Sequence, residues 1–420
     1  MTRINRAQEC ASREEKFAGL RSILSRMAET GHPYAKRMAE RGIRPDDVSS
    51  YEDLSLLPTT TKYDILNNYP LGWLAVDKKD VVRIHATNGS TGKPTLVAYT
   101  EGDLLMWARN MAWCMSLAGV NGDDIVQVSF AYGLFTGGFG FHEGASLLGA
   151  AVVPISDGFT DRQVSIMRDL GSSVLACTPS YALRLAEGIE RTCGDGLSLR
   201  LGFFGAESWS DELRKSLESR LGIKAIDLYG LSEAMGPGVS SECLEQNGLH
   251  ISDDFIAQTV DPKTLETLED GSEGELVLTS WKKQAFPLVR YRTRDITSLM
   301  PGPCPCGEPT PRMARVRGRS DDMLIIRGVN VFPSQVEAAI CAVPGMSPNF
   351  QISAWRDSGL QEMSIDCEMS GERDAEDIEA MGRDLAHSIK QSIGVTIPFE
   401  ILPPGALQRT DGRAERIIKK

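Results

Sequence analysis

The segment Thr87-Asn88-Gly89-Ser90-Thr91-Gly92-Lys93-Pro94 holds the residue types that most directly suggest chemistry. Its two glycines let a loop fold tightly, so that backbone N–H groups, hydroxyls and one lysine converge on an anion such as a phosphate. The spacing does not fit the P-loop pattern G-x-x-x-x-G-K-[ST], because the glycines are three apart and a proline follows the lysine. We therefore expect a phosphate-binding loop of another kind. A plain strand-to-helix connection is the alternative.

Short β-rich runs alternate with amphipathic helical segments from residue 81 onward. This alternation predicts an α/β fold with a mostly parallel sheet, and loops that follow such strands are where ligands bind. The predicted strands are residues 81–85, 125–130, 151–155, 174–177, 199–204 and 225–229, and the predicted helices include 161–170 and 210–221.

The flanking regions differ in texture. Residues 14–68 show apolar positions at helical spacing, while residues 237–317 are rich in strands and turns and predict a smaller β-subdomain. After the charged stretch 319–322, the pattern predicts a compact α+β unit with helices at 333–342 and 375–392. We predict two domains: a large N-terminal domain over residues 1–320 and a small C-terminal domain over residues 321–420.

Composition limits the classes of partner. The formal net charge is −12 and the isoelectric point is near 5.1, which argues against binding nucleic acid or an anionic membrane. No apolar run is as long as a membrane span and the N-terminus is polar, so we expect a cytoplasmic protein. The nine cysteines are scattered and odd in number, so most are expected to be free thiols.

Five short segments occur together in one order across nearly the whole chain. They are residues 87–94, Gly205-Ala206-Glu207, Tyr229-Gly230-Leu231-Ser232-Glu233, Tyr291-Arg292-Thr293-Arg294-Asp295 and Gly318-Arg319-Ser320-Asp321-Asp322. Together they resemble the adenylate-forming superfamily. Residues 82–86, 132–138 and 321–333 are similar to its phenylacetate:coenzyme A ligase branch.

The resemblance implies an ATP-dependent reaction with Mg²⁺. A carboxylate attacks the α-phosphate of ATP, pyrophosphate leaves, and the acyl adenylate passes its acyl group to the thiol of coenzyme A. Lys93 and Glu233 are then catalytic, with Glu233 coordinating Mg²⁺. The implied ATP-binding residues are Thr87, Asn88, Gly89, Ser90, Thr91, Gly92, Gly205, Ala206, Glu207, Asp227, Tyr229, Gly230, Ser232, Asp295 and Arg319.

Several of these residues also have plain structural explanations. Asp295 is suited to accept hydrogen bonds from ribose hydroxyls, but it is alternatively a solvated turn aspartate paired with Arg292 or Arg294. Tyr229 offers a flat face to adenine or is simply a core tyrosine. In relatives an arginine at the position of Arg319 reaches the nucleotide, and a mobile C-terminal lid domain rotates about the position of Asp321. An exposed charged linker is the alternative.

One position departs from the family pattern. Arg413 stands where the resemblance implies a catalytic lysine that bridges the substrate carboxylate and the α-phosphate. A guanidinium keeps the charge and binds both groups, although it is planar and bulkier than an ammonium. We predict that Arg413 substitutes for the lysine. A slower reaction, or the use of Lys419 or Lys420 from a shifted tail, is the alternative.

The acid-binding segment carries an unusual carboxylate. The residues that resemble the aryl acid pocket are Tyr132, Phe135, Thr136, Gly137, Gly138, Phe141, His142 and Glu143. Relatives commonly carry a tyrosine where Glu143 sits. A carboxylate there can accept a hydrogen bond from a ring substituent, which predicts an amino- or hydroxybenzoate such as hydroxyanthranilate, with a phenylacetate-like acid as the alternative. Equally, Glu143 pairs with His142 or Arg184 and never touches the substrate.

Three cysteines and one histidine form a second constellation. Cys243, His250, Cys304 and Cys306 supply the four ligands of a tetrahedral structural zinc site, although the Cys-x-Cys spacing is tighter than usual. Resemblance to metal-containing relatives favours Zn²⁺ here. The alternative is packed thiols and a surface histidine. His85 lacks such partners and is expected to pack at the start of the loop.

The leading functional hypothesis is thus an aryl acid:coenzyme A ligase. The alternatives are a ligase that loads a carrier protein or releases its adenylate, and a nucleotide-binding protein weakened in catalysis by Arg413. A zinc-dependent nucleic-acid module is disfavoured by the net acidity. Relatives are often homodimers.

Overall fold

The computed structural model describes residues 10–87, 94–192, 196–320, 323–326, 329–357, 360–408 and 416–419. The N-terminal region is helical, as predicted, with α1 (Arg13–Glu29), α2 (Pro33–Glu40) and α3 (Lys62–Leu66). Ser12 and Glu15 form a capping box that begins α1. Between α1 and α2, Gly31 adopts a φ of 65°, and His32 then caps α2. The break between these two helices is therefore a cap followed by a new helix.

The large sheet has the strand order β13-β14-β9-β8-β7-β6-β5-β3-β4. Its strands β3 (Ile125–Val128), β4 (Ala151–Val153), β5 (Val174–Cys177), β6 (Leu201–Gly205) and β7 (Lys224–Leu231) run parallel. The continuation through β8 (Gly236–Glu242), β9 (Leu249–Ile251), β13 (Leu299–Met300) and β14 (Arg312–Met313) is antiparallel. The direction of the sheet thus changes immediately after the Tyr229-Gly230 pair.

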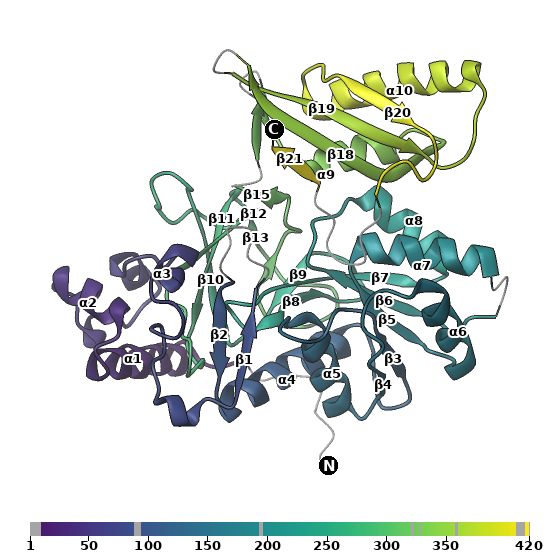
Figure 1. The fold of residues 1–420 in the computed structure, drawn as a ribbon. Coiled ribbons are helices and arrows are strands. Elements are labelled where there is room, and N and C mark those ends of the chain that lie inside the picture. Colours follow the sequence, from purple (N-terminus) through teal and green to yellow (C-terminus); the bar gives the residue numbers. More distant parts are fainter. Residues whose placement is uncertain are drawn as a thin grey trace.

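Both faces of the inner parallel strands β5 and β6 are buried. Along β5, Val174 and Ala176 belong to the core that includes α4 (Glu101–Leu117) and α5 (Gly137–Leu148). Leu175 and Cys177 face the core formed with α6 (Thr160–Leu170), α7 (Pro179–Thr192) and α8 (Asp211–Leu221). This alternation follows from the two-residue period of a strand. Helices therefore cover both faces of these strands, with α4 and α5 on one face and α6, α7 and α8 on the other (Figure 1).

The region predicted as a β-subdomain contributes to two sheets. Part of it extends the large sheet, and part forms the sheet β10-β11-β12-β15. These strands are β10 (Phe255–Val260), β11 (Gly274–Ser280), β12 (Tyr291–Thr297) and β15 (Gly318–Arg319). A separate antiparallel pair, β1 (Arg83–Ala86) and β2 (Leu96–Tyr99), flanks the predicted phosphate loop.

The C-terminal region has its own hydrophobic core, which lies above the large sheet in Figure 1. Its elements are β16 (Leu324–Ile326), β17 (Val329–Val331), α9 (Pro333–Cys341), β18 (Met346–Asp357), β19 (Leu360–Met369), α10 (Ala375–Ile393), β20 (Phe399–Leu402) and β21 (Ile417–Lys419). The predicted hinge residue Asp321 lies outside the described residues. Among the described residues, no helix is long and apolar enough to cross a membrane.

His32 makes the stability of the helical N-terminal region depend on pH. Its Nδ1 accepts from Tyr34 N at 3.1 Å and its Nε2 donates to Trp73 O at 2.9 Å. Burial lowers the pKa of His32 to about 4, and the bond to Trp73 only partly opposes that shift. The folded protein therefore holds a neutral imidazole, whereas the unfolded chain takes up a proton below about pH 6.5.

We expect the unfolding free energy to fall by roughly 2 kcal/mol as the pH drops from 7 to 5, because of this one residue. The measurement is chemical unfolding at both pH values, for the wild type and for His32→Gln. The wild type should lose more stability than the variant over this range. Equal losses in the two proteins would contradict the assignment.

Candidate functional site

Three segments that are distant in the chain meet at the carboxyl end of β7. Tyr229, near the end of that strand, donates its hydroxyl to Asp295 Oδ2 at 2.5 Å. Asp295 lies in β12 in register with Arg319 of β15, and Arg319 Nη1 is 3.5 Å from Asp295 Oδ1. Burial, and then the neighbouring Asp295 charge, raise the pKa of Tyr229, so its hydroxyl keeps its proton. These predicted nucleotide ligands therefore form one connected cluster.

The alternative explanation of Asp295, a solvated turn aspartate paired with Arg292 or Arg294, is wrong. Asp295 is 8% exposed and belongs to a strand, so it is not a solvated turn residue. The two arginines expected to pair with it face another carboxylate: Arg292 Nη2 lies 2.7 Å from Glu275 Oε2, and Arg294 Nη1 lies 3.8 Å from the same oxygen. Glu275 thus pairs with both arginines. Asp295 instead contacts Tyr229 and Arg319.

Gly205, Ala206 and Glu207 continue from β6 next to this cluster. A Cβ on Gly205 would lie 2.2 Å from Leu228 O, so only glycine permits the approach to β7. Ala206 is exposed and adopts a φ of 68°, which costs energy for a residue with a side chain. Glu207 accepts from Ser180 Oγ at 2.6 Å. Strained backbone of this kind concentrates at functional sites.

Asp227 has a partner that the sequence did not indicate. Arg315 Nε donates to Asp227 Oδ2 at 2.7 Å, and its guanidinium lies 4.5 Å from the ring centroid of Trp209. Asp227 is buried, so this bond satisfies its charge. The ion pair with Arg315 therefore fixes Asp227 next to residues 205–207.

The predicted phosphate loop connects two antiparallel strands, so the strand-to-helix alternative is wrong. At its base, Thr87 N donates to Thr95 O at 3.0 Å, and Thr95 N donates to Thr87 Oγ1 at 3.2 Å. Pro94 lies within this base. The remaining predicted residues Asn88, Gly89, Ser90, Thr91, Gly92 and Lys93 lie outside the described residues.

Glu233 lies in the turn between β7 and β8, and buried donors hold that turn. Lys283 Nζ donates to Glu233 O at 2.7 Å, and Tyr99 of β2 donates its hydroxyl to Met235 O at 3.0 Å. The Glu233 carboxylate is 3.8 Å from Lys62 Nζ. Because Tyr99 belongs to β2, this bond ties the turn to the hairpin that carries the phosphate loop.

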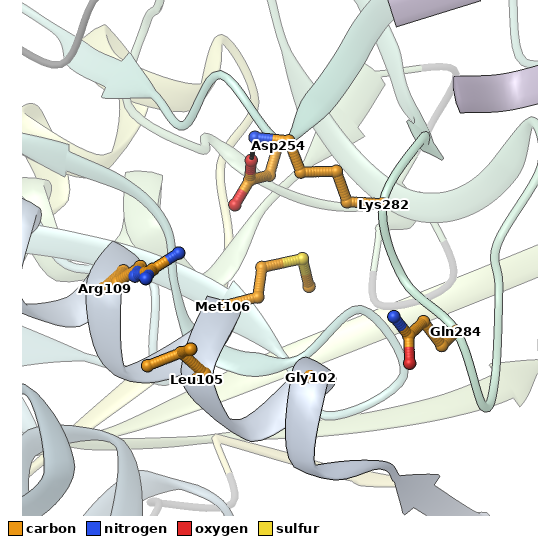
Figure 2. A pocket seen from close by; sticks show the side chains of 7 residues that line it. All are labelled: Gly102, Leu105, Met106, Arg109, Asp254, Lys282 and Gln284. Carbon is orange, nitrogen blue, oxygen red and sulfur yellow. Dashed lines mark hydrogen bonds and ion pairs between the residues drawn. The ribbon is translucent and has the colours of Figure 1, made fainter. Parts of the chain in front are cut away.

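Lys283 is fully buried, and burial lowers its pKa to about 8 against the opposing charges of Asp103 and Glu233. Its neighbour Lys282 points to the other side and pairs with Asp254 at 2.5 Å. Figure 2 shows this second side, where Lys282 and Asp254 line a pocket of about 370 Å³ together with α4. None of the predicted site residues within the described ranges lines that pocket.

Residues of the predicted acid pocket make polar contacts around α5. Arg83 Nη2 lies 3.1 Å from Glu143 Oε1, with both side chains about one-third exposed, and the Arg83 guanidinium lies 5.4 Å from the ring centroid of Phe139. The Tyr132 hydroxyl and His142 Nδ1 are 3.4 Å apart. The sequence did not indicate Arg83 as the partner of Glu143, since the two positions are sixty residues apart.

The remaining pocket candidates divide between the site and the core. Thr136 Oγ1 is 3.0 Å from Ser232 Oγ, which joins the pocket segment to the turn that carries Glu233. Phe141 is 1% exposed and stacks on Phe130 with ring centroids 5.4 Å apart, so its side chain fills the core. The other candidates in this segment are Phe135, which is partly exposed, and Gly137 and Gly138, which begin α5.

Cys243, His250, Cys304 and Cys306 come together, with their ligand atoms all within 4.8 Å of one another. The Sγ atoms of Cys243 and Cys304 are 3.7 Å apart, and Cys306 Sγ is 3.3 Å from His250 Nε2. His250 is fully buried, so the expectation of a surface histidine is wrong. Burial lowers its pKa to about 4, which keeps the imidazole neutral as a metal ligand requires.

Other predicted residues lie outside the described ranges, namely Arg413, Lys420 and Asp321. Sequence reasoning missed Lys62, Lys283 and Arg315 as parts of the site. A lysine or arginine in a polar sequence carries no sign that it is buried beside a strand end. Arg83 was also missed as a partner of Glu143, although it lies within residues 82–86, which carry part of the resemblance.

Two family profiles match this chain. The sequence profile of the AMP-binding enzyme family matches residues 23–281, and the profile of the AMP-binding enzyme C-terminal domain matches residues 328–420. Phenylacetate-coenzyme A ligase of Pseudomonas putida is 45% identical over 417 residues, which cover 98% of this chain and 94% of that protein.

Two crystal structures of 2-hydroxyisobutyryl-CoA ligase are also similar, and each alignment covers 99% of this chain and 91% of that one. The structure in the postadenylation state with 2-HIB-AMP is 25% identical with a TM-score of 0.91. The structure in the thioesterification state with 2-HIB-AMP and CoA is 26% identical with a TM-score of 0.71. The chain therefore belongs to the AMP-binding enzyme family, in its phenylacetate:coenzyme A ligase-like branch, and is an acid–thiol ligase.

Proposed function

We propose that this ligase activates an aryl carboxylic acid with a polar ring substituent, through an acyl adenylate, and transfers it to coenzyme A. The observation that carries the choice of acid is the Arg83–Glu143 pair beside Tyr132 and His142. A carboxylate in the pocket wall accepts a hydrogen bond from an amino or hydroxyl group on the ring, whereas an unsubstituted ring gains no such bond. The second candidate is phenylacetate, favoured by the 45% identity to the Pseudomonas putida enzyme.

The nucleotide is assigned to the cluster at the end of β7. Asp295 is placed to accept from ribose hydroxyls, Tyr229 to lie against adenine, and Arg319 to carry a positive charge toward the phosphates. Arg413 is assigned the bridge between acid and α-phosphate, which makes it the residue that acts on the reacting atoms. Carrier-protein loading and homodimer formation stay predictions.

Mg²⁺ is assigned to Glu233. A carboxylate oxygen is the ligand that Mg²⁺ prefers, and the ion supplies charge neutralisation for the departing pyrophosphate. The donor set fits, because Glu233 is 6% exposed and its turn is fixed through Lys283 and Tyr99. Lys283 is therefore proposed as a positioning residue for this carboxylate.

Zn²⁺ is assigned to the Cys₃His cluster as a structural ion. Ligand sulfurs at about 2.3 Å from a tetrahedral ion lie roughly 3.8 Å apart, close to the observed 3.7 Å between Cys243 and Cys304. His250 Nδ1 lies 3.2 Å from Thr310 Oγ1, which orients Nε2 toward Cys306 as outer hydrogen bonds do in metal sites.

The conformation is assigned to the adenylate-bearing stage of the cycle. The same ligase gives TM-scores of 0.91 and 0.71 in its postadenylation and thioesterification structures. The higher score supports an arrangement of the two regions of this chain like that of the postadenylation structure.

The acid preference is tested by comparing kcat/KM for phenylacetate, benzoate, aminobenzoates and hydroxybenzoates, from pyrophosphate release. We expect the best substituted benzoate to exceed phenylacetate about tenfold, as one added hydrogen bond to a carboxylate allows. Glu143→Gln should reduce that ratio, because it weakens the acceptor. A preference for phenylacetate that survives Glu143→Gln favours the second candidate. Absence of acid-dependent pyrophosphate exchange with every acid would favour a weakened binder.

The zinc assignment predicts about one zinc ion per chain in metal analysis of protein purified without chelator. Cys306→Ser should lower zinc retention and reduce the melting temperature by about 5 °C or more, since binding energy at such a site is folding energy. Cys10→Ser, at an exposed free cysteine, is the control and should keep its zinc. A zinc-free protein of unchanged melting temperature would rule out the assignment.

If Lys283 positions Glu233, its loss should impair the use of Mg²⁺ and ATP and leave coenzyme A binding unchanged. In Lys283→Met the stem remains but the bond to Glu233 O is lost, so the Mg²⁺ concentration for half-maximal rate should rise about tenfold. The KM for coenzyme A should stay unchanged. Lys282→Met is the matched control, because its ammonium pairs with Asp254 on the opposite side (Figure 2). If both variants behave alike, the positioning role is excluded.

A further inference from the structure

A buried carboxylate of the C-terminal region docks onto the N-terminus of a helix in the large region. Glu337 of α9 accepts a hydrogen bond from Ser210 N at 2.7 Å, and Ser210 is the N-cap of α8. The Glu337 side chain is 3% exposed, and its second oxygen lies 3.5 Å from Arg416 Nη2. Helices α8 and α9 thus meet across the boundary between the two regions (Figure 1).

The chemistry of this contact makes it specific for one arrangement. The N-terminus of a helix carries partial positive charge and unpaired N–H groups, which attract a carboxylate. A buried carboxylate without such partners is costly, so Glu337 cannot leave Ser210 without becoming solvated or paired elsewhere. Arg416 belongs to the same C-terminal region and would move with it. The bond to Ser210 N is thus the part of the contact that depends on the arrangement.

Other boundary contacts lie next to the chain connection. Ser334 Oγ donates to Arg317 O, and the ring of Phe332 packs where a Cβ on Gly318 would lie 2.6 Å away. These residues flank the connection between the regions at residues 318–332. Glu337 and Ser210 are instead 127 residues apart in sequence, and Ser210 follows the Gly205-Ala206-Glu207 segment assigned to the nucleotide.

We propose that Glu337 is a positioning residue that holds the C-terminal region in the arrangement for adenylate formation. Release of its bond to Ser210 N then precedes the thioester step. The inference rests on the proposed assignment of this arrangement to the adenylate-bearing stage. It adds a specific latch that sets the balance between the two half-reactions.

The test measures the half-reactions separately in the full-length enzyme. Adenylate formation is followed by acid-dependent exchange of labelled pyrophosphate into ATP, and thioester formation by a single turnover of added acyl adenylate with coenzyme A. In Glu337→Ala we expect exchange to fall about tenfold, while thioester formation is unchanged or faster. A parallel fall in both rates, or no change in their ratio, would overturn the proposal.

A matched pair at Ser210 isolates the N–H group. Ser210→Ala and Ser210→Pro both remove the hydroxyl that accepts from Leu213 N, but only proline removes the donor to Glu337. The φ of −84° at Ser210 lies close to the range that proline adopts. Proline should lower the ratio of exchange to thioester formation about tenfold relative to alanine. Equal ratios in the two variants would refute the latch, even if Glu337→Ala fails to fold.

Glu379→Gln on α10 is the control, because Glu379 is exposed and its carboxylate pairs with Arg383 of the same helix at 2.8 Å. Both of its rates should match the wild type. If the wild type forms no adenylate with any acid, the proposed function fails instead. The two failures are therefore distinguishable.

Discussion

The turn between β7 and β8 fixes the positions of the other residues of the candidate site. The sheet reverses direction there, and a Cβ on Gly230 would lie 2.0 Å from Gly236 O, so a side chain at that position is excluded. Tyr229 on one side of the turn reaches Asp295, and Ser232 within it reaches Thr136 of the acid pocket segment. The residues proposed to bind the nucleotide, the metal and the acid are therefore positioned by one short piece of backbone.

The turn is held by a buried polar network whose charges balance. A buried ammonium is unfavourable unless it is paired, and Lys283 satisfies that need through Glu233 O and the nearby Asp103 charge. Asp103 accepts from Gln284 N at 2.6 Å and Ala285 N at 2.9 Å, next to Lys283 in the chain. It also caps the start of α4 with Thr100. The network thus joins α4, the turn and residues 283–285 into one unit.

The sequence predicted the elements that are fixed by local pattern. Strand β5 reads as a continuous apolar run because both of its faces are buried, and Ser210 marks the start of α8 because it is a good N-cap. The hairpin around the phosphate loop was missed, since pairing of β1 with β2 is decided by register across a loop. Phe141 looked like a pocket residue because its segment resembles one, whereas its orientation on α5 directs it to the core. Long-range partners such as Arg83 for Glu143 carry no local signal.

The segment around the Cys₃His cluster has little hydrophobic core of its own. Residues 301–311 are rich in proline and glycine, and Cys304 is the apolar side chain that they bury among the described residues. Arg312 holds this segment through Gly302 O at 3.1 Å, and it holds the β8–β9 connection through Asn247 O at 2.7 Å. Such hydrogen bonds each contribute little net stability, whereas a metal ion bound by the four converging side chains would link both segments at one point. The proposed Zn²⁺ would supply here the cohesion that a hydrophobic core supplies elsewhere in the fold.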